Sequence, residues 1–238
     1  FFNATAFNQP IGEWDVGDVT IMGHMFDNAK AFNQPIGTWD VGKVTHMRYM
    51  FCDAIAFNQP VGDWNVGKVT DMSSMFSGAK AFNKPIGTWD VGKVTTMSYM
   101  FCGAIAFNQP VGDWNVGTVN DMSGMFNRAE AFNQPIGAWD VGKVTDMRYM
   151  FNRATSFDQD VDNWNVGEVT ATHDMFRNVV KFSRNPPHWR NGEVEIFLYN
   201  DSYNDKILVR RNPYCACPVI KRACALFSNQ SQSVLAPA

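Results

Sequence analysis

The chain has 238 residues, of which 45% are hydrophobic and 14% aromatic, and its formal net charge is −3. This is ample apolar material for a folded core, so the composition excludes a disordered chain. There is no basic block, and no apolar run approaches the roughly 20 residues of a membrane-spanning helix, so we expect neither nucleic-acid binding nor a transmembrane segment.

A unit of 25 residues recurs along most of the chain without insertion or deletion. One copy is residues 32–56, FNQPIGTWDVGKVTHMRYMFCDAIA, the next begins at Phe57, and all eight tryptophans share one phase from Trp14 to Trp189. A fixed period of this length predicts a solenoid, in which each coil buries its apolar face on its neighbours. The chain opens inside a unit and without an initiator Met, so we expect a processed or truncated product.

Each unit predicts a short strand followed by a short helix. Residues 7–12, FNQPIG, alternate and are bounded by turn residues, which favours an extended segment stacked on its copies. The apolar residues of 22–29 recur at i, i+3, i+4 and i+7, which predicts a helix of about two turns. Thr20 stands where the N-cap of that helix would lie.

The predicted fold is therefore α/β, a leucine-rich-repeat-like βα solenoid of about eight 25-residue coils. The solenoid would occupy residues 1–194. Residues 195–211 carry two apolar segments around a polar turn cluster, which predicts a β-hairpin that caps the open end of the stack. Residues 212–238 form a cysteine-containing C-terminal tail.

The repeat core, F-N-Q-P-[IV]-G-x-W-[DN]-V-G-x-V-T-x-M-x-x-M-F, resembles that of the BspA-like leucine-rich-repeat surface proteins. The resemblance covers residues 1–194. It implies a leucine-rich-repeat-like solenoid at a cell surface or outside the cell, engaged in adhesion or protein binding, and it supplies no catalytic residues.

One polar ladder alternates between carboxylate and amide along the coils. Stacked carboxylates would repel one another, and an intervening amide can donate to the carboxylates above and below it, so we interpret this row as a structural ladder. A row of calcium ions is the alternative, although each coil offers few carboxylates for it. The ladder consists of Asp40, Asn65, Asp90, Asn115, Asp140 and Asn165.

Two further rows are candidates for binding another molecule. The first is Asn33, Asn58, Asn83, Asn108 and Asn133, which either satisfies backbone groups along the stack or presents outward amides to a partner. The second is Tyr49, Tyr99 and Tyr149, on alternate coils, whose rings either serve as interface anchors or pack over neighbouring coils.

The cysteines form two groups. Cys52 and Cys102 are equivalent positions two coils apart, too far for a disulfide, and we expect them to fill space. In the tail, Cys215 or Cys217 can pair with Cys224. A zinc site there is the weaker alternative because no fourth ligand stands at zinc spacing, so we predict no metal and no cofactor.

The sequence thus predicts a non-enzymatic binding solenoid, because it contains no phosphate loop, metalloprotease motif or nucleophile elbow. Its partners would be other proteins or surface polymers. The main alternative is a structural subunit, scaffold or linker, docked into a larger assembly through its hairpin and tail. A threonine that recurs once per coil, replaced by Asn120 in one coil, leaves ice binding as a minor alternative.

Overall fold

The computed structural model describes residues 1–167 and 170–179. The chain divides into two units, Phe1–Trp189 and Arg190–Ala238, and every described residue belongs to the first. The predicted hairpin at 195–211, the tail at 212–238 and its cysteine pairing lie outside the described residues. The alternative of a subunit docked through these segments therefore stays a prediction.

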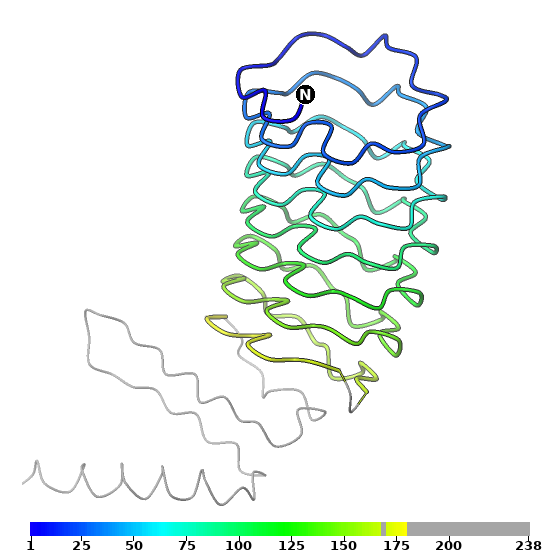
Figure 1. The fold of residues 1–238 in the computed structure, drawn as a ribbon. Coiled ribbons are helices and arrows are strands. Elements are labelled where there is room, and N and C mark those ends of the chain that lie inside the picture. The colour runs from blue at the N-terminus through cyan, green and yellow to red at the C-terminus, as the bar shows by residue number, and fades with distance from the viewer. Residues whose placement is uncertain (168–169, 180–238) are drawn as a thin grey trace, which may run out of the picture. The chain divides into compact units, whose positions relative to one another are not determined.

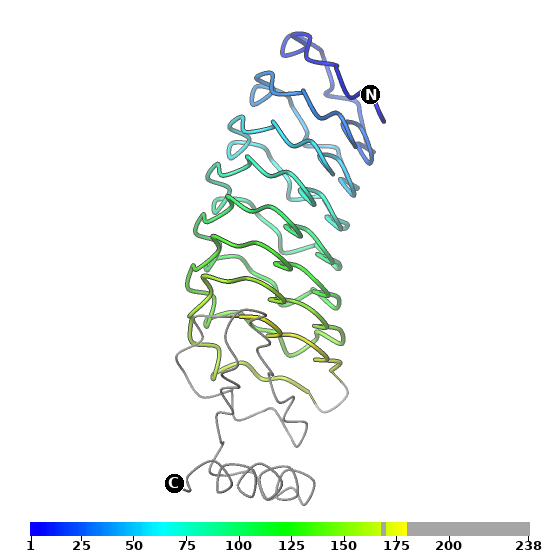
Figure 2. The same ribbon diagram turned by 90° about the vertical axis from the view of Figure 1, so that its left-hand side faces the viewer.

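The first unit is a stack of coils, in which each copy of the repeat makes one turn and returns the chain to the equivalent position (Figures 1 and 2). Among the described residues, six isolated parallel bridges join neighbouring coils, at equivalent positions from Ile21 to Ala171. Parallel pairing places neighbouring backbones about 4.8 Å apart. The predicted repeat solenoid is confirmed.

Every second amide of residues 22–28 donates to the next coil. The N–H of Phe26, for example, donates to the carbonyl oxygen of Met50 at 2.8 Å. Amides between these positions close turns within the coil, such as Met25 N–H to the Met22 carbonyl at 3.3 Å. The same bonds recur at the equivalent positions of the following coils, so the coils are joined by a backbone ladder along the stack.

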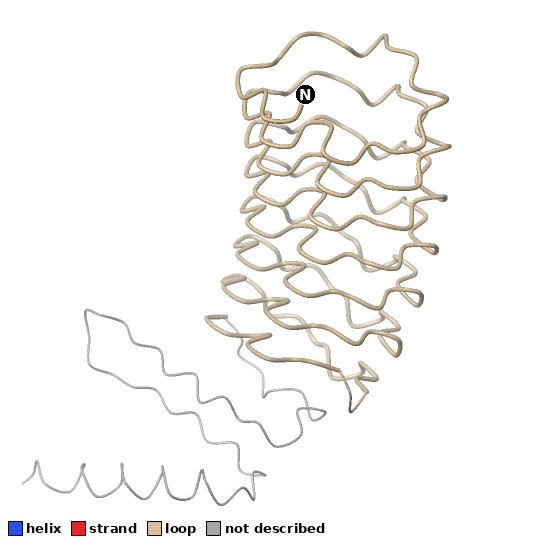
Figure 3. Cartoon of the chain, viewed as in Figure 1, coloured by secondary structure: helices blue, strands red, loops and turns tan. Residues whose placement is uncertain are grey.

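The helix expected over 22–29 is not formed. The described residues contain no helix and no strand longer than a single bridge (Figure 3), so the α/β class is not confirmed. His24 and Asn28 both have φ of 59°, a left-handed conformation that a right-handed helix cannot contain. Without a helix Thr20 has no end to cap, and its carbonyl instead accepts the Thr45 hydroxyl at 3.1 Å.

The strand expected over 7–12 is also absent. The bridges lie later in the unit, at Ile21 and its equivalent positions. Pro10 has no amide hydrogen to contribute to a ladder. Side chains of the preceding Asn and Gln make the connection between coils at this position instead.

Stacked aromatic rings fill the interior. Along one row, equivalent rings on successive coils are 5.5–5.8 Å apart between centroids. From Phe26 to Phe151, each ring of this row also stacks at 3.8–4.1 Å on the phenylalanine that begins the next copy of the repeat. The first row is Phe26, Phe51, Phe76, Phe101, Phe126, Phe151 and Phe176, and all of them are buried.

Tryptophans close one side of this core. From Trp39 to Trp164 they are 2–4% exposed, whereas Trp14 in the first coil is 49% exposed. Each buried indole donates to a carbonyl of the preceding coil, as Trp39 Nε1 does to the Ile11 oxygen at 3.1 Å. The repeated Phe, Trp and Met side chains thus form the core of the described coils beyond the first.

Candidate functional site

The predicted tyrosine row lies at a sharp corner of alternate coils. Tyr49 and Tyr99 are 37% and 39% exposed, and Tyr149 is half-buried. All three have left-handed backbone, with φ of 56°, 56° and 59°. Their amides donate to the next coil, Tyr49 to the Ser73 carbonyl at 2.9 Å for example. The corner is therefore held rigidly by the backbone ladder.

Each tyrosine ring also contacts a neighbouring coil. Tyr49 stacks on His24 with centroids 4.7 Å apart, and Tyr149 meets His173 edge to face at 5.9 Å. The Tyr99 ring covers Gly124 so closely that a Cβ there would overlap it. The rings are thus oriented by packing while part of their surface stays open to solvent, which combines features of both sequence-based alternatives.

Burial of the Tyr99 hydroxyl raises its pKa, with smaller contributions in the same direction from Cys102 and Asp146. The tyrosine therefore stays neutral at physiological pH. A neutral phenol offers a flat apolar ring and one hydrogen-bonding tip, which suits contact with another molecule.

The Asn row joins coils along the FNQP segment. The amide oxygen of Asn83 accepts the backbone N–H of Asn108 at 3.0 Å and the Gln109 side chain at 2.9 Å. The bond to the backbone recurs for Asn33, Asn58, Asn108 and Asn133. These side-chain oxygens are therefore occupied within the stack. A second role in contacting a partner stays a prediction.

We expect Asn83→Ala to destabilise the stack by about 1–2 kcal/mol, because the half-buried Asn108 N–H loses its acceptor. Chemical denaturation of both proteins measures the difference. Asn83→Asp is the matched control: it keeps an acceptor oxygen, and Asp158 occupies the equivalent position of a later coil. Equal losses in the two variants would contradict this role for the side-chain oxygen.

The alternating Asp/Asn ladder is exposed and bonds locally. Asp40 Oδ1 accepts the Gly42 N–H at 2.9 Å, and Asn65 Oδ1 accepts that of Gly67 at 3.2 Å. The same turn recurs at Asp90, Asn115 and Asp140, whereas Asn165 is exposed. Among the described residues no hydrogen bond joins an amide of this ladder to a carboxylate above or below it. The side chains thus stabilise a turn in each coil.

The threonine hydroxyls donate to the backbone. Thr95 Oγ1 bonds the Thr70 carbonyl and Thr145 Oγ1 the Asn120 carbonyl, both at 3.1 Å. A hydroxyl that donates its hydrogen within the stack is not free to donate it to a flat array of water molecules. The geometry therefore gives the ice-binding alternative no support.

The two cysteines of the described coils are half-buried thiols. Burial, together with Asp27 and Asp53, raises the pKa of Cys52 to about 12. Burial likewise raises the pKa of Cys102. Since the thiolate is the reactive form, both thiols are unreactive at neutral pH. In residues 1–167 and 170–179, no group of three or more His, Cys, Asp or Glu side chains is placed to hold a metal ion.

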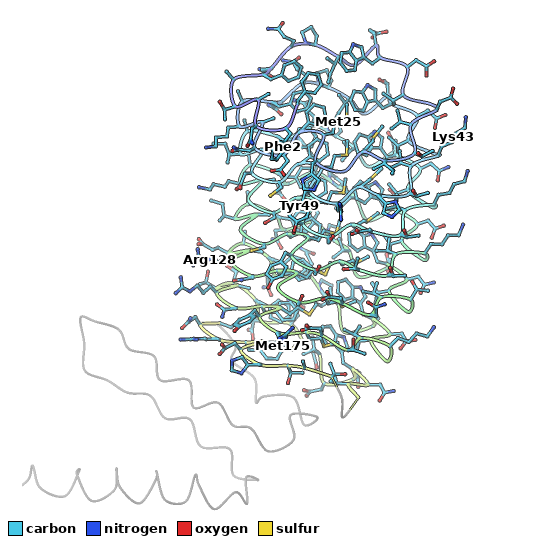
Figure 4. All side chains as sticks on the ribbon, in the orientation of Figure 1. Phe2, Met25, Lys43, Tyr49, Arg128 and Met175 are labelled. Carbon is cyan, nitrogen blue, oxygen red and sulfur yellow. The ribbon has the colours of Figure 1, made fainter. Side chains whose placement is uncertain are left out.

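A shallow groove of about 280 Å³ lies at the last described coils. We call it the arginine groove; its lining is Asn127, Arg128, Tyr149, Asn152, Arg153, Arg177 and Asn178. Arg128 points outward at one edge of the stack, and Lys43 lies at the opposite edge (Figure 4). Of these residues only Tyr149 is among the candidates predicted from the sequence. Arg128 and Arg153 occupy equivalent positions of successive repeats, a signal that was available in the sequence.

None of the described residues belongs to a helix with the length and apolar character needed to cross a bilayer. A comparison with curated proteins finds no match. Among solved structures, an internalin (InlF) from Listeria monocytogenes is similar at 10% sequence identity, over 61% of this chain and 65% of that chain, with a TM-score of 0.17. So low a score carries no argument about fold or function.

A family model does match most of the chain. The family described as "Mycoplasma protein of unknown function, DUF285" matches residues 1–109 and again residues 82–189. The two overlapping matches follow the coils described above and together span them. The chain therefore belongs to the DUF285 family of repeat proteins.

Proposed function

We propose that the protein is a non-enzymatic solenoid that binds another protein, at a cell surface or outside the cell. The resemblance to BspA-like surface proteins supports the location and the adhesive role. The single observation that carries the proposal is the tyrosine row, a set of partly exposed aromatic rings held at fixed corners of the stack.

The physical support is pre-organisation. Binding normally costs conformational entropy when side chains and loops become ordered at an interface. At Tyr49 and Tyr99 the backbone is already tied to the next coil, by hydrogen bonds of 2.9 and 2.8 Å. The Tyr49 ring is also fixed, since it stacks on His24. A partner would therefore meet two aromatic anchors, a residue type that dominates binding energy at interfaces.

The test begins with the full chain immobilised and exposed to surface proteins extracted from its own cells. Retained proteins are identified by mass spectrometry, purified and titrated against the free chain by calorimetry. We expect the variant Tyr49→Ser/Tyr99→Ser to bind the purified partner at least about tenfold more weakly. Serine fits this corner because Ser74 occupies it in the coil between.

The matched control is Ile55→Thr/Ile105→Thr. Ile55 and Ile105 lie on the same two coils, are 39% and 41% exposed, and have Thr155 as the equivalent residue of a later coil. We expect this control to change the affinity by less than about threefold. Equal losses in the two variants, or no partner that binds in purified form, would refute the proposal.

A further inference from the structure

A second corner of each coil, at the repeat position of Arg128, changes charge along the stack. The first coils place Asn28 and Asp53 there, with Asp27 beside Asn28, followed by neutral Gly78 and Gly103. The last described coils place Arg128, Arg153 and Arg177 at or beside the same corner. The core beneath repeats while this corner does not. The basic end is therefore a local feature superimposed on a regular scaffold.

Two of the three guanidinium groups at this end are available to a ligand. Arg128 and Arg153 are exposed, and neither forms an ion pair with another described residue. Arg177 lies 3.4 Å from the carboxylate of buried Asp174, which fixes the third arginine in place. The backbones that carry Arg128 and Arg153 are about 4.8 Å apart by the parallel spacing. Two arginines on neighbouring coils, without an ion pair in the described part of the chain, therefore concentrate positive charge in a small space.

The groove offers no strand edge to an incoming peptide. The N–H of Arg128 already donates to the Asn152 carbonyl at 2.7 Å, and that of Arg153 to the Arg177 carbonyl at 2.8 Å. An extended peptide also places same-face side chains about 6.7 Å apart, which differs from the coil spacing of about 4.8 Å. The side chains that line the groove are polar or aromatic, so it lacks the apolar pockets that hold peptide side chains.

We propose that the arginine groove binds an acidic polysaccharide, a chain of sugars that carry sulfate or carboxylate groups. Arg128 and Arg153 would each donate two parallel hydrogen bonds to an anionic group. Asn127 and Asn152 offer amide donors and acceptors to sugar hydroxyls. The Tyr149 ring, held edge to face by His173 at 5.9 Å, offers a flat surface to the apolar face of a sugar ring.

Tyr149 belongs to both the tyrosine row and the groove, but the tests of the two proposals are distinguishable, because Tyr49 and Tyr99 lie on earlier coils and do not line the groove. The test titrates the full chain by calorimetry with a size-defined, sulfated dextran oligosaccharide. The variant is Arg128→Asn/Arg153→Asn, since asparagine at Asn28 and Asn178 adopts the same left-handed backbone. We expect affinity to fall at least about tenfold. Neutral dextran of the same length should not bind.

The matched control is Lys68→Thr/Lys93→Thr, which removes the same two charges from exposed positions of another row. Threonine is native there, because Thr118 is the equivalent residue. We expect less than about threefold loss from this control. Equal losses would show general charge attraction and overturn the proposal, as would absence of binding to the sulfated oligosaccharide at low salt.

Tyr149→Ser separates a sugar from a peptide. It removes the aromatic surface without altering charge, and we expect about fivefold weaker binding of the sulfated oligosaccharide. A polyglutamate of equal charge is the competitor, and we expect it to bind more weakly than the oligosaccharide. If polyglutamate binds more tightly and Tyr149→Ser has no effect, the groove is an acidic-peptide site and the proposal fails.

Discussion

Replacing Phe101 by alanine is expected to cost about 3–5 kcal/mol, the range for deleting a fully buried aromatic ring. The Phe101 ring is completely buried and stacks at 4.0 Å on Phe107, which begins the next copy of the repeat. It also stacks on Phe76 and Phe126 in the coils before and after, at 5.8 and 5.6 Å. The substitution therefore opens a cavity that interrupts the aromatic row in both directions.

Urea denaturation followed by tryptophan fluorescence measures this loss. Because each coil contacts only its neighbours, the weakened coil should also divide the stack into two units that unfold separately, which broadens the transition. Ile105→Ala is the control: this side chain, on the same coil, is 41% exposed and should cost less than about 1 kcal/mol. Similar losses for the two variants would show that the aromatic row does not dominate stability.

Gly112→Ala is the second change with a large expected effect. A Cβ at this position would overlap the carbonyl oxygen of Pro135 in the next coil. A backbone oxygen cannot rotate away, so the two coils must separate and strain the ladder between them. We expect a loss of about 3 kcal/mol, at the upper end of the range for overpacking, measured by the same denaturation experiment.

Gly117→Ala tests whether the cause is the close approach of the coils. A Cβ at Gly117 would lie 3.4 Å from Asn115 Oδ1 and 3.5 Å from Asp140 Oδ2, which is ordinary contact. The change should stay within about 1 kcal/mol of the parent protein in either direction. If Gly112→Ala is equally harmless, the coils are not in the close contact that the structure shows.

The sequence predicted the interior of the stack well. A fixed period identifies equivalent positions without knowledge of the backbone, so the rows of Phe51 and Trp64 follow directly from counting. The periodicity could not identify the backbone between them. A backbone with left-handed residues at His24 and Asn28 brings the apolar side chains of Met22, Phe26 and Ala29 inward, at the same spacing as a helix. His24 is one of the left-handed residues, and no special residue type marks that position.

The candidate binding residues were predictable in part. The tyrosine row was found because it repeats on alternate coils. The arginine groove depends on Arg128 and Arg153, which share a phase but occur only near the end of the repeats. A repeat pattern does not reveal charges that change from one coil to the next. Only the structure shows that these arginines of neighbouring coils line one groove.

Backbone hydrogen bonds that run from coil to coil, and not along a helix, are the central feature of this fold. Scalar couplings across hydrogen bonds, measured by NMR on the deuterated protein, test this claim directly. We expect the Phe51 amide to couple to the Met75 carbonyl carbon and the Tyr49 amide to that of Ser73, across bonds of 2.9 Å. Coupling from the Phe51 amide to the carbonyl of Met47, four residues earlier, would be the signature of an α-helix and would contradict the account.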